Sequence, residues 1–267
     1  MGRFVCLALI VVVGLGVHLP DPRQAPSVQT RIASREPAEL LSTGRTPYFI
    51  LEPGYSLVLQ GGDAQLTVTV LNETKRVDGV EARVVEERET RRGRPVEVSR
   101  NYFAISKRTG DVFHFGEDVN AYKDGRIVAH AGAWLSGVNG ARFGLMMPGR
   151  VMLGARHYQE IAPKVALDRA TIVGTRVTVK TPAGEFTNCL MVEETSPLQR
   201  FTTEYKYYAP GVGLVQDGAL KLVRVTREGK EFSPCVSSVG QGQSPRPGSG
   251  SWCSEQSSGP AGGHRSS

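Results

Sequence analysis

Three predicted β-strands joined by two tight turns, in residues 101–134, constrain the fold of this chain more than any other stretch. The pair Asp124-Gly125 stands between two apolar runs. This is a hairpin signal, because both central positions of such a turn need positive φ. Sequential strands at this spacing favour a meander in which each strand lies beside its predecessor. The sequence therefore predicts an all-β fold with minor helix, either a curved antiparallel meander sheet or a partly open β-barrel.

Polar and apolar residues alternate on both sides of this stretch, as they do in half-buried strands. Residues 132–154 differ, because they hold six glycines around the apolar centre Leu145-Met146-Met147. We predict a long loop there that covers or plugs the core. Residues 165–171 are the candidate for one or two helical turns. The predicted strands are residues 48–51, 55–59, 65–71, 79–89, 96–105, 111–122, 127–134, 175–180, 186–194, 202–208, 213–216 and 219–227.

Composition divides the chain into four segments. Arg3 precedes an apolar or glycine run at residues 4–17, which has the length of a secretory core segment, so residues 1–19 are predicted to be a signal peptide. Residues 20–46 are predicted to be a flexible linker and residues 47–228 an antiparallel β-domain. Residues 229–267 are predicted to be a disordered tail, because Ser, Gly and Pro make up 22 of the last 35 residues. We expect an exported protein (periplasmic, cell-envelope or extracellular) that is peripheral to a membrane at most; an uncleaved, weakly anchored N-terminus is the alternative.

The net charge of +6 draws partly on an arginine cluster at residues 91–94, where nearby glutamates make the local balance mixed. We predict a solvated hairpin tip, with a patch for acidic polymers or anionic lipid heads as the alternative. No nucleic-acid partner is indicated. Export would permit Cys235 and Cys253 to pair. Cys189 lies among apolar residues and is predicted to be a buried, inert thiol.

Motif tests argue against several classes of chemistry. The chain contains no phosphate-binding loop, dinucleotide fingerprint, nucleophile elbow, H-E-x-x-H motif or zinc spacing. An EF-hand match fails because Tyr122 and Lys123 stand where the loop needs Asp or Asn and then Gly. The sequence thus predicts no cofactor, no metal and no assigned catalytic residue. A calcium site of another kind, using Glu117 and Asp118, stays open.

Histidines and acids cluster in and after residues 101–134, which raises the question of acid–base catalysis. Proton transfer requires groups within hydrogen-bond reach of one another. The simpler interpretation makes His114 an ordinary strand residue between two phenylalanines. For catalysis, His114, Glu117 or Asp118 would have to converge with His157, Glu160 or Asp168.

Four short motifs follow one another through the predicted domain. They are Thr74-Lys75-x-x-x-Gly79-Val80, Val112-x-x-Phe115-Gly116-Glu117-Asp118, Gly132-x-Trp134 and Tyr205-Lys206-Tyr207-Tyr208-Ala209-Pro210-Gly211-Val212-Gly213-Leu214-Val215. Through them, residues 48–225 resemble a group of exported bacterial proteins of uncharacterised function; the chain departs from the group at residues 164–169. The resemblance implies a shape similar to the half-open barrels of periplasmic lipoprotein-carrier proteins, which bind acyl chains on a concave apolar face.

The leading functional hypothesis is a non-enzymatic protein of the cell envelope that binds an apolar or amphipathic ligand, such as a lipid, in the concave sheet. A loop at residues 135–150 would gate the cavity. One alternative is a hydrolase or metal-assisted enzyme using Glu117, Asp118 and Glu160, and another is an interaction module with a filled core. Neither the ligand nor the oligomeric state follows from the sequence. The candidate ligand-binding residues are Glu117, Trp134, Phe143, Met146 and Tyr207.

Overall fold

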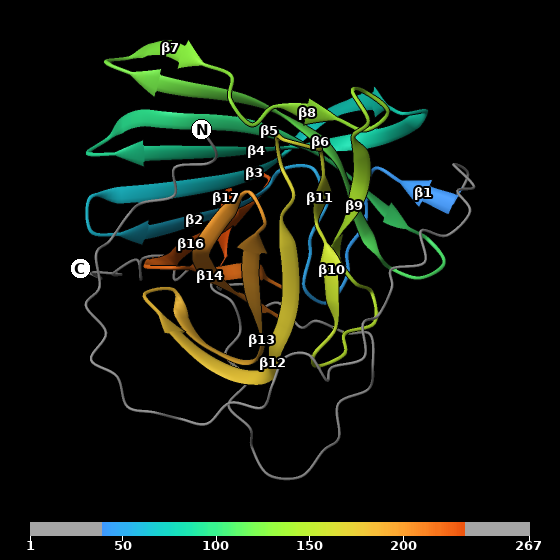
Figure 1. The fold of residues 1–267 in the computed structure, drawn as a ribbon. Helices are drawn as coiled ribbons and strands as arrows, with labels where there is room; N and C mark the ends of the chain where they lie inside the picture. The colour runs from blue at the N-terminus through green and yellow to red at the C-terminus, as the bar shows by residue number, and fades with distance from the viewer. Residues whose placement is uncertain (1–38, 233–267) are drawn as a thin grey trace, which may run out of the picture.

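The computed structural model describes residues 39–232, and within them it contains seventeen β-strands and no α-helix. The strands form an antiparallel sheet that curls into a nearly closed barrel with one unsealed seam (Figure 1). The predicted all-β class and curved, partly open shape are confirmed. The predicted minor helix is wrong, because residues 163–165 form a turn and a strand begins at Arg169. No helix within residues 39–232 is long and apolar enough to cross a membrane.

The first half of the chain builds one wall of the barrel. Strands β2 to β6 pair in chain order, and β6 also pairs with the short strands β7, β8 and β9. This is the meander predicted from sequence. The strands of this half are β1 (Leu40–Leu41), β2 (Tyr55–Gly61), β3 (Ala64–Val77), β4 (Val80–Arg91), β5 (Arg94–Ser106), β6 (Val112–Lys123), β7 (Arg126–Ala129), β8 (Trp134–Leu135) and β9 (Arg142–Met147).

The second half builds the facing wall, below the first in Figure 1. Strands β12 to β17 again pair in chain order, and β16 also pairs with β2, which joins the two walls along one side. The strands are β10 (Arg156–Tyr158), β11 (Glu160–Ile161), β12 (Arg169–Thr181), β13 (Gly184–Ser196), β14 (Gln199–Ala209), β15 (Gly213–Asp217), β16 (Leu220–Arg227) and β17 (Lys230–Phe232).

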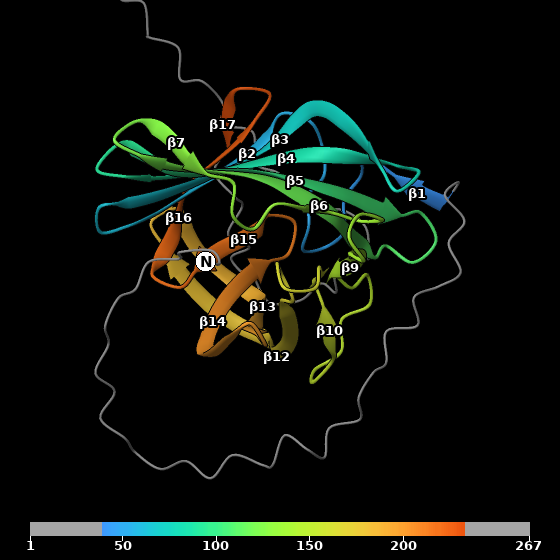
Figure 2. The ribbon, with the colours of Figure 1, turned by 45° about the horizontal axis from the view of Figure 1, so that its top comes forward.

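The other side is bridged by the chain between β10 and β11. Strand β11 pairs with β9 of the first wall, β10 pairs with β12 of the second, and only Gln159 separates β10 from β11. The bridge lies so close to β9 that a Cβ on Gly144 would be 2.3 Å from the carbonyl oxygen of Gln159. A glycine is therefore required where the bridge crosses. In Figure 2 both walls are seen obliquely, with β9 and β10 at their right-hand end.

The ordered sheet extends beyond the predicted domain boundaries. Leu40 and Leu41 pair with Ser106 and Ile105 of β5, so the sheet begins inside the segment predicted to be a linker. At the other end, β17 lies beyond residue 228. Residues 48–51, predicted to be a strand, contribute only one isolated bridge, from Arg45 to Ile50. The predicted signal peptide, the first part of the linker, most of the tail and the proposed cysteine pair lie outside the described residues.

Tight turns confirm the hairpin signals. Asp124 and Gly125 have φ values of 52° and 76° between β6 and β7, as a two-residue hairpin turn requires. Arg92 and Gly93 have φ values of 50° and 73° in the arginine cluster between β4 and β5. Arg92 Nε lies 3.0 Å from an oxygen of Asp63, so this hairpin tip carries a surface ion pair.

Successive side chains of β5 point to opposite faces of the sheet and enter two different apolar cores. Phe103 and Ile105 point between the two walls, where they join the main core. Tyr102 and Ala104 point to the opposite face and join a smaller core that also contains Phe115. Burial of apolar side chains on both faces explains why β5 is apolar almost continuously over its second half. The small outer core fixes β8 and β9 against the first wall.

A bulge at Gly116 sets which side chains of β6 face inward. Its φ is 142°, and a Cβ there would lie 2.4 Å from the carbonyl oxygen of Trp134. The β5–β6 register shifts here, between the pairs Phe103–His114 and Asn101–Glu117. Because a bulge adds one residue to the alternation, both His114 and Glu117 face the interior, although they are three positions apart.

We expect Gly116→Ala to destabilise the fold by about 2 kcal/mol more than Gly125→Ala. The control incurs only the cost of a left-handed alanine, about 1–2 kcal/mol, because nothing lies within 4 Å of a Cβ at Gly125. Alanine at position 116 adds a clash with backbone atoms, and overpacking typically costs about 1–3 kcal/mol. Urea unfolding monitored by circular dichroism measures both values. Equal losses would show that the close approach at Gly116 is not a structural requirement.

Candidate functional site

An apolar cavity of about 70 Å³ lies between the two walls. It is narrow, with room for a few groups the size of a water molecule or for a short hydrocarbon segment. Aromatic rings, aliphatic side chains and Met146 form most of its lining. Its lining residues are Tyr48, Phe49, Ile50, Tyr55, Leu57, Val68, Val70, Val85, Glu87, Phe103, Met146, Lys206, Tyr208, Val212, Gly213, Leu214 and Asp217.

The segment before β2 forms part of the lining of this cavity, through residues 48–50. The Tyr55 hydroxyl donates a buried 2.7 Å hydrogen bond to the carbonyl of Val212, and burial raises the pKa of that hydroxyl. Gly211 N–H donates to the carbonyl of Pro47. Phe49 packs edge-on against Phe103, with ring centroids 5.2 Å apart. Contacts with the turn between β14 and β15 thus hold this segment, which pairs little with the sheet, against the cavity.

A second cavity, of about 60 Å³, adjoins the first and is lined by acidic side chains. Six of its lining residues carry carboxyl groups and one, Lys206, carries an amine. Glu87, Lys206 and Asp217 line both cavities, so the apolar space and the acidic space lie next to each other at these side chains. The lining residues are Leu66, Glu87, Glu89, Asp168, Glu194, Thr195, Ser196, Gln199, Thr202, Glu204, Lys206 and Asp217.

Lys206 is the positive centre of this region. Its Nζ lies 2.8 Å from Glu194 Oε2 and 4.0 Å from Asp217 Oδ2, and these three side chains are only 13–17% exposed. Gln159, from the bridge between the walls, donates to Glu194 at 3.0 Å. Ion pairs screened from water in this way are stronger than surface pairs. The network therefore links the bridge to β13 and β14 of the second wall.

A separate polar cluster is buried where β6 pairs with β8. His114 Nδ1 lies 3.5 Å from Glu160 Oε1, with the two side chains 2% and 4% exposed. The His114 ring lies 5.2 Å from Trp134 and 4.7 Å from Phe103, measured between centroids. Glu117, 1% exposed, pairs with Trp134 across β6 and β8. The convergence of His114 with Glu160, which sequence reasoning posed as a condition for catalysis, is present.

The five candidate ligand-binding residues do not surround one cavity. Met146 lines the apolar cavity, whereas Trp134 borders a different cavity, of about 250 Å³, next to the turn at residues 162–166. Phe143 packs on Phe113 and Phe115 in the small outer core. Glu117 lies in the buried cluster with Trp134.

Tyr207 stands one position away from the residue that lines the cavity. Tyr207 is partly buried at the margin of the main core, while Tyr208 is 4% exposed and lines the apolar cavity. The register shifts between Tyr207 and Tyr208 where β14 pairs with β15. Because neighbouring strand residues point to opposite faces, an error of one position exchanges the faces. Alternation from the buried Cys189–Val192 region of the partner strand is the signal that identifies Tyr208.

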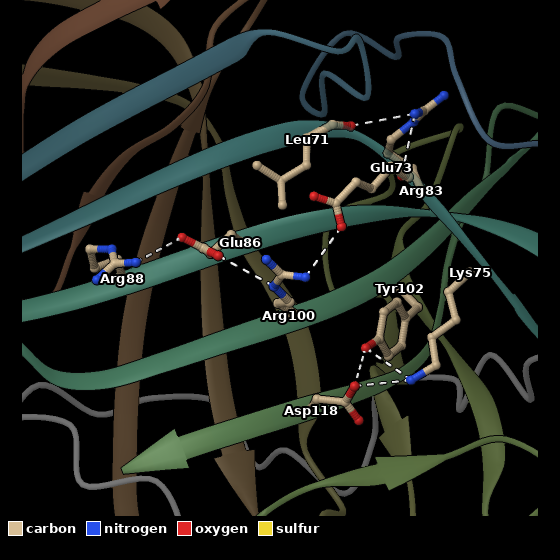
Figure 3. Close-up of polar contacts among 9 residues, drawn as sticks. All are labelled: Leu71, Glu73, Lys75, Arg83, Glu86, Arg88, Arg100, Tyr102 and Asp118. Atoms are coloured by element: carbon tan, nitrogen blue, oxygen red, sulfur yellow. Dashed lines mark hydrogen bonds and ion pairs between the residues drawn. The ribbon is translucent and has the colours of Figure 1, made fainter. Parts of the chain in front are cut away.

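Asp118 is exposed and lies next to Tyr102 and Lys75 (Figure 3), whereas Glu117, its neighbour on β6, is buried. It accepts a very short hydrogen bond from the Tyr102 hydroxyl and an ion pair from Lys75 Nζ at 2.9 Å. Burial raises the pKa of the Asp118 carboxyl, but these two donors outweigh it and the pKa is lowered. Two of the four sequence motifs therefore meet here, Lys75 from the first and Asp118 from the second. Asp118 and Glu160 do not share a site.

Within residues 39–232, no group of three or more His, Cys, Asp or Glu side chains is arranged to hold a metal ion. Cys189 is fully buried, as predicted, and burial raises the pKa of its thiol to about 11. A thiol that stays protonated at neutral pH is a poor nucleophile. Cys189 therefore fits a packing role beside the cavity.

His157, on β10 next to the bridge, is a buried titratable residue. Burial lowers its pKa to about 4, against smaller upward effects from a hydrogen bond with the Met146 backbone and from Glu194. The ordinary value, about 6.5, applies to the unfolded chain. Between these pH values the unfolded chain binds the proton and the folded chain does not. The stability contributed by neutral His157 is therefore present above about pH 6.5 and lost as the pH falls toward 4.

We expect His157→Gln to flatten the pH dependence of stability between pH 6.5 and 4. The wild-type chain should lose about 3 kcal/mol more than this variant across that window, because each pKa unit corresponds to about 1.4 kcal/mol. Urea titrations at several pH values measure the difference. His130→Gln, at an exposed position, is the matched control and should follow the wild type. Parallel curves for wild type and His157→Gln would contradict the assignment.

Comparisons with models of protein families, with curated proteins and with solved structures found no match. The resemblance to exported bacterial proteins therefore stays a prediction from the four motifs. The fourth motif supplies Lys206, Tyr208, Val212, Gly213 and Leu214 to the wall of the apolar cavity. Function is accordingly argued from the geometry of this interior.

Proposed function

We propose that this chain is an exported, non-enzymatic protein that binds an amphipathic ligand between the two walls of its barrel. The ligand has an apolar body and a positively charged end group. The observation that carries the proposal is the junction of the two cavities at Glu87, Lys206 and Asp217. An apolar space that adjoins a charged one matches a molecule with the same two parts.

The sign of the end group follows from the lining of the second cavity. Six carboxyl residues and one lysine give it an excess of negative charge. Low-dielectric walls strengthen the field of such a cluster and raise the local concentration of cations. An amine or a guanidine on the ligand would reduce the repulsion among these carboxylates, whereas a carboxylate or phosphate would increase it.

The apolar end must widen to admit more than a short hydrocarbon segment, and Met146 is the side chain suited to this. It lines the cavity, and its sulfur lies 3.6 Å from Gln159 Nε2 of the bridge. Methionine is unbranched and changes rotamer easily, so it adapts to ligands of different shape. Of the residues 135–150 that were predicted to gate the cavity, we therefore assign this role to Met146 on β9 and to the loop that follows β9.

Export rests on the sequence alone. The apolar run at residues 4–17 and the proline-containing segment after it support removal of the first nineteen residues. Export also suits a protein that carries an apolar molecule through an aqueous compartment, because such a ligand needs shelter from water there.

An enzyme is the alternative that the buried His114–Glu160 pair favours. His–carboxylate pairs act as acid–base groups when a substrate reaches them. Here His114, Glu117 and Glu160 are at most 4% exposed, and the His114 ring contacts Trp134. Because burial of this degree leaves a substrate no direct access to these side chains, we favour a structural role for the pair.

An interaction module with a filled core is the second alternative. Most of the interior is indeed filled, and the apolar cavity is small. Dye uptake separates the two hypotheses, because a filled core has no place for an apolar probe.

We expect the delipidated chain to take up a hydrophobic dye, and Val68→Trp to weaken uptake by roughly tenfold or more, equivalent to about 1.4 kcal/mol. Val68 lines the cavity, and an indole in its place fills the space. Met146→Ala should act in the opposite direction and strengthen uptake of a bulkier dye. Fluorescence titration measures all three affinities.

Thr67→Trp is the matched control, because Thr67 precedes Val68 on β3 and points to the other face. It should bind dye as the wild type does. Each variant is first checked for the wild-type circular dichroism spectrum. The proposal fails if the wild type takes up no dye, or if the two tryptophan variants behave alike.

A further inference from the structure

The loop between β9 and β10, residues 148–155, holds apolar side chains out into solvent. Met152 is 46% exposed and Leu153 is 66% exposed. Gly154 N–H of the loop donates a hydrogen bond to the carbonyl of Ile172. The next residue of β12, Val173, is 39% exposed. Figures 1 and 2 both show this loop projecting beyond the end of β10. Its tip therefore presents a small apolar surface.

The backbone of the loop is fixed at both ends. Gly149 N–H donates to Asp111 Oδ1 at 2.8 Å, and a Cβ at Gly149 would lie 2.0 Å from the carbonyl oxygen of Thr109. At the other end, Ile172 N–H donates to the carbonyl of Ala155 at 2.9 Å. Exposure of the tip is thus a consequence of a defined backbone path, which holds Met152 and Leu153 away from the core.

Basic side chains surround the tip. Arg150 and Arg156 are exposed on either side of it. Lys107 and Arg108 lie in the β5–β6 turn, which packs against the base of the loop at Gly149, and Arg108 forms a 3.0 Å ion pair with Glu39. Asp111 is the nearest acid on that turn, and its two oxygens accept hydrogen bonds from Gly149 and Thr109. The apolar tip therefore sits within a positively charged rim.

We propose that this loop docks the protein on an anionic lipid bilayer, with Met152 and Leu153 inserted at the headgroup boundary. Long arginine side chains reach back to lipid phosphates while their stems follow the apolar groups inward. Each basic residue near an anionic membrane adds to the attraction. Two side chains are too small a surface for a stable protein interface, which buries about 1,000 Å² or more, whereas they suffice for reversible lipid contact.

The occupant of the ligand cavity and the membrane surface would then lie near each other. Val151 and Ala155, at the base of the loop, pack against the main core, as does the cavity-lining Met146. A docked loop would bring the Met146 side of the barrel toward the bilayer. The docking inference does not depend on the ligand. If the chain binds dye but not vesicles, the proposed function stands and the docking inference is wrong.

The test uses residues 20–267 and co-sedimentation with vesicles of phosphatidylcholine, with and without phosphatidylglycerol, at low ionic strength. We expect binding to the anionic vesicles that weakens as salt is added. Leu153→Ser should reduce the fraction bound by about tenfold, the effect of withdrawing one leucine from an apolar medium. Leu198→Ser is the matched control, because Leu198 is 45% exposed on the β13–β14 turn, outside the loop.

The charged rim is tested separately. Arg150→Gln with Arg156→Gln should reduce the preference for anionic over neutral vesicles, while Arg94→Gln with Arg126→Gln, at exposed positions that begin β5 and β7, should keep it. Absence of vesicle binding by the wild type overturns the inference, and so does equal binding by the two serine variants. A shift in self-association of Leu153→Ser without lipid would assign the tip to a second copy of the chain instead, and also overturns it.

Discussion

Pairing between β16 and β2 joins the two walls into one curled sheet with an enclosed interior. Register partners run from Lys221–Gln60 to Arg227–Tyr55 and join the last long strand to the first. This contact between distant parts of the chain places the wall built by β2–β6 opposite the wall built by β12–β15. Apolar side chains of both walls then form one core, and the cavities lie where that core is incompletely filled. Loss of this pairing would leave two open sheets and no enclosed site.

Carboxylates inside a barrel are costly to keep ionised unless they gain partners. Lys206 and Gln159 supply some of that compensation through Glu194, and they come from the second wall and from the bridge. The same network therefore stabilises the closure of the barrel and defines the acidic side of the candidate site. We infer that ligand binding and closure are linked, because a cation in this cavity would neutralise carboxylates that both walls contribute.

Local patterns determine how much of this structure is predictable from sequence. Asp124-Gly125 and Arg92-Gly93 specify their turns by backbone preference, and alternation in β3, β5 and β13 specifies strands. The contacts that build the site are different in kind: Glu194 meets Gln159 across 35 positions of sequence, and Tyr55 meets Val212 across 157. The bulge at Gly116 changes which side chains of β6 face inward, and alternation carries no sign of it. The register shift beside Tyr208 puts its extra residue, Val215, on β15, so β14 keeps its alternation and pairing with Leu190 of β13 identifies Tyr208 as the inward residue.

Calorimetric titration with two amphipaths of equal chain length, an alkylamine and the corresponding alkyl carboxylate, measures the charge preference of the interior. We expect the amine to bind with one-to-one stoichiometry and at least about tenfold more tightly than the carboxylate, a difference of about 1.4 kcal/mol. We also expect the difference to shrink in Glu87→Gln, because Glu87 lines both cavities. Equal affinity for the two amphipaths, or tighter binding of the carboxylate, would contradict this expectation.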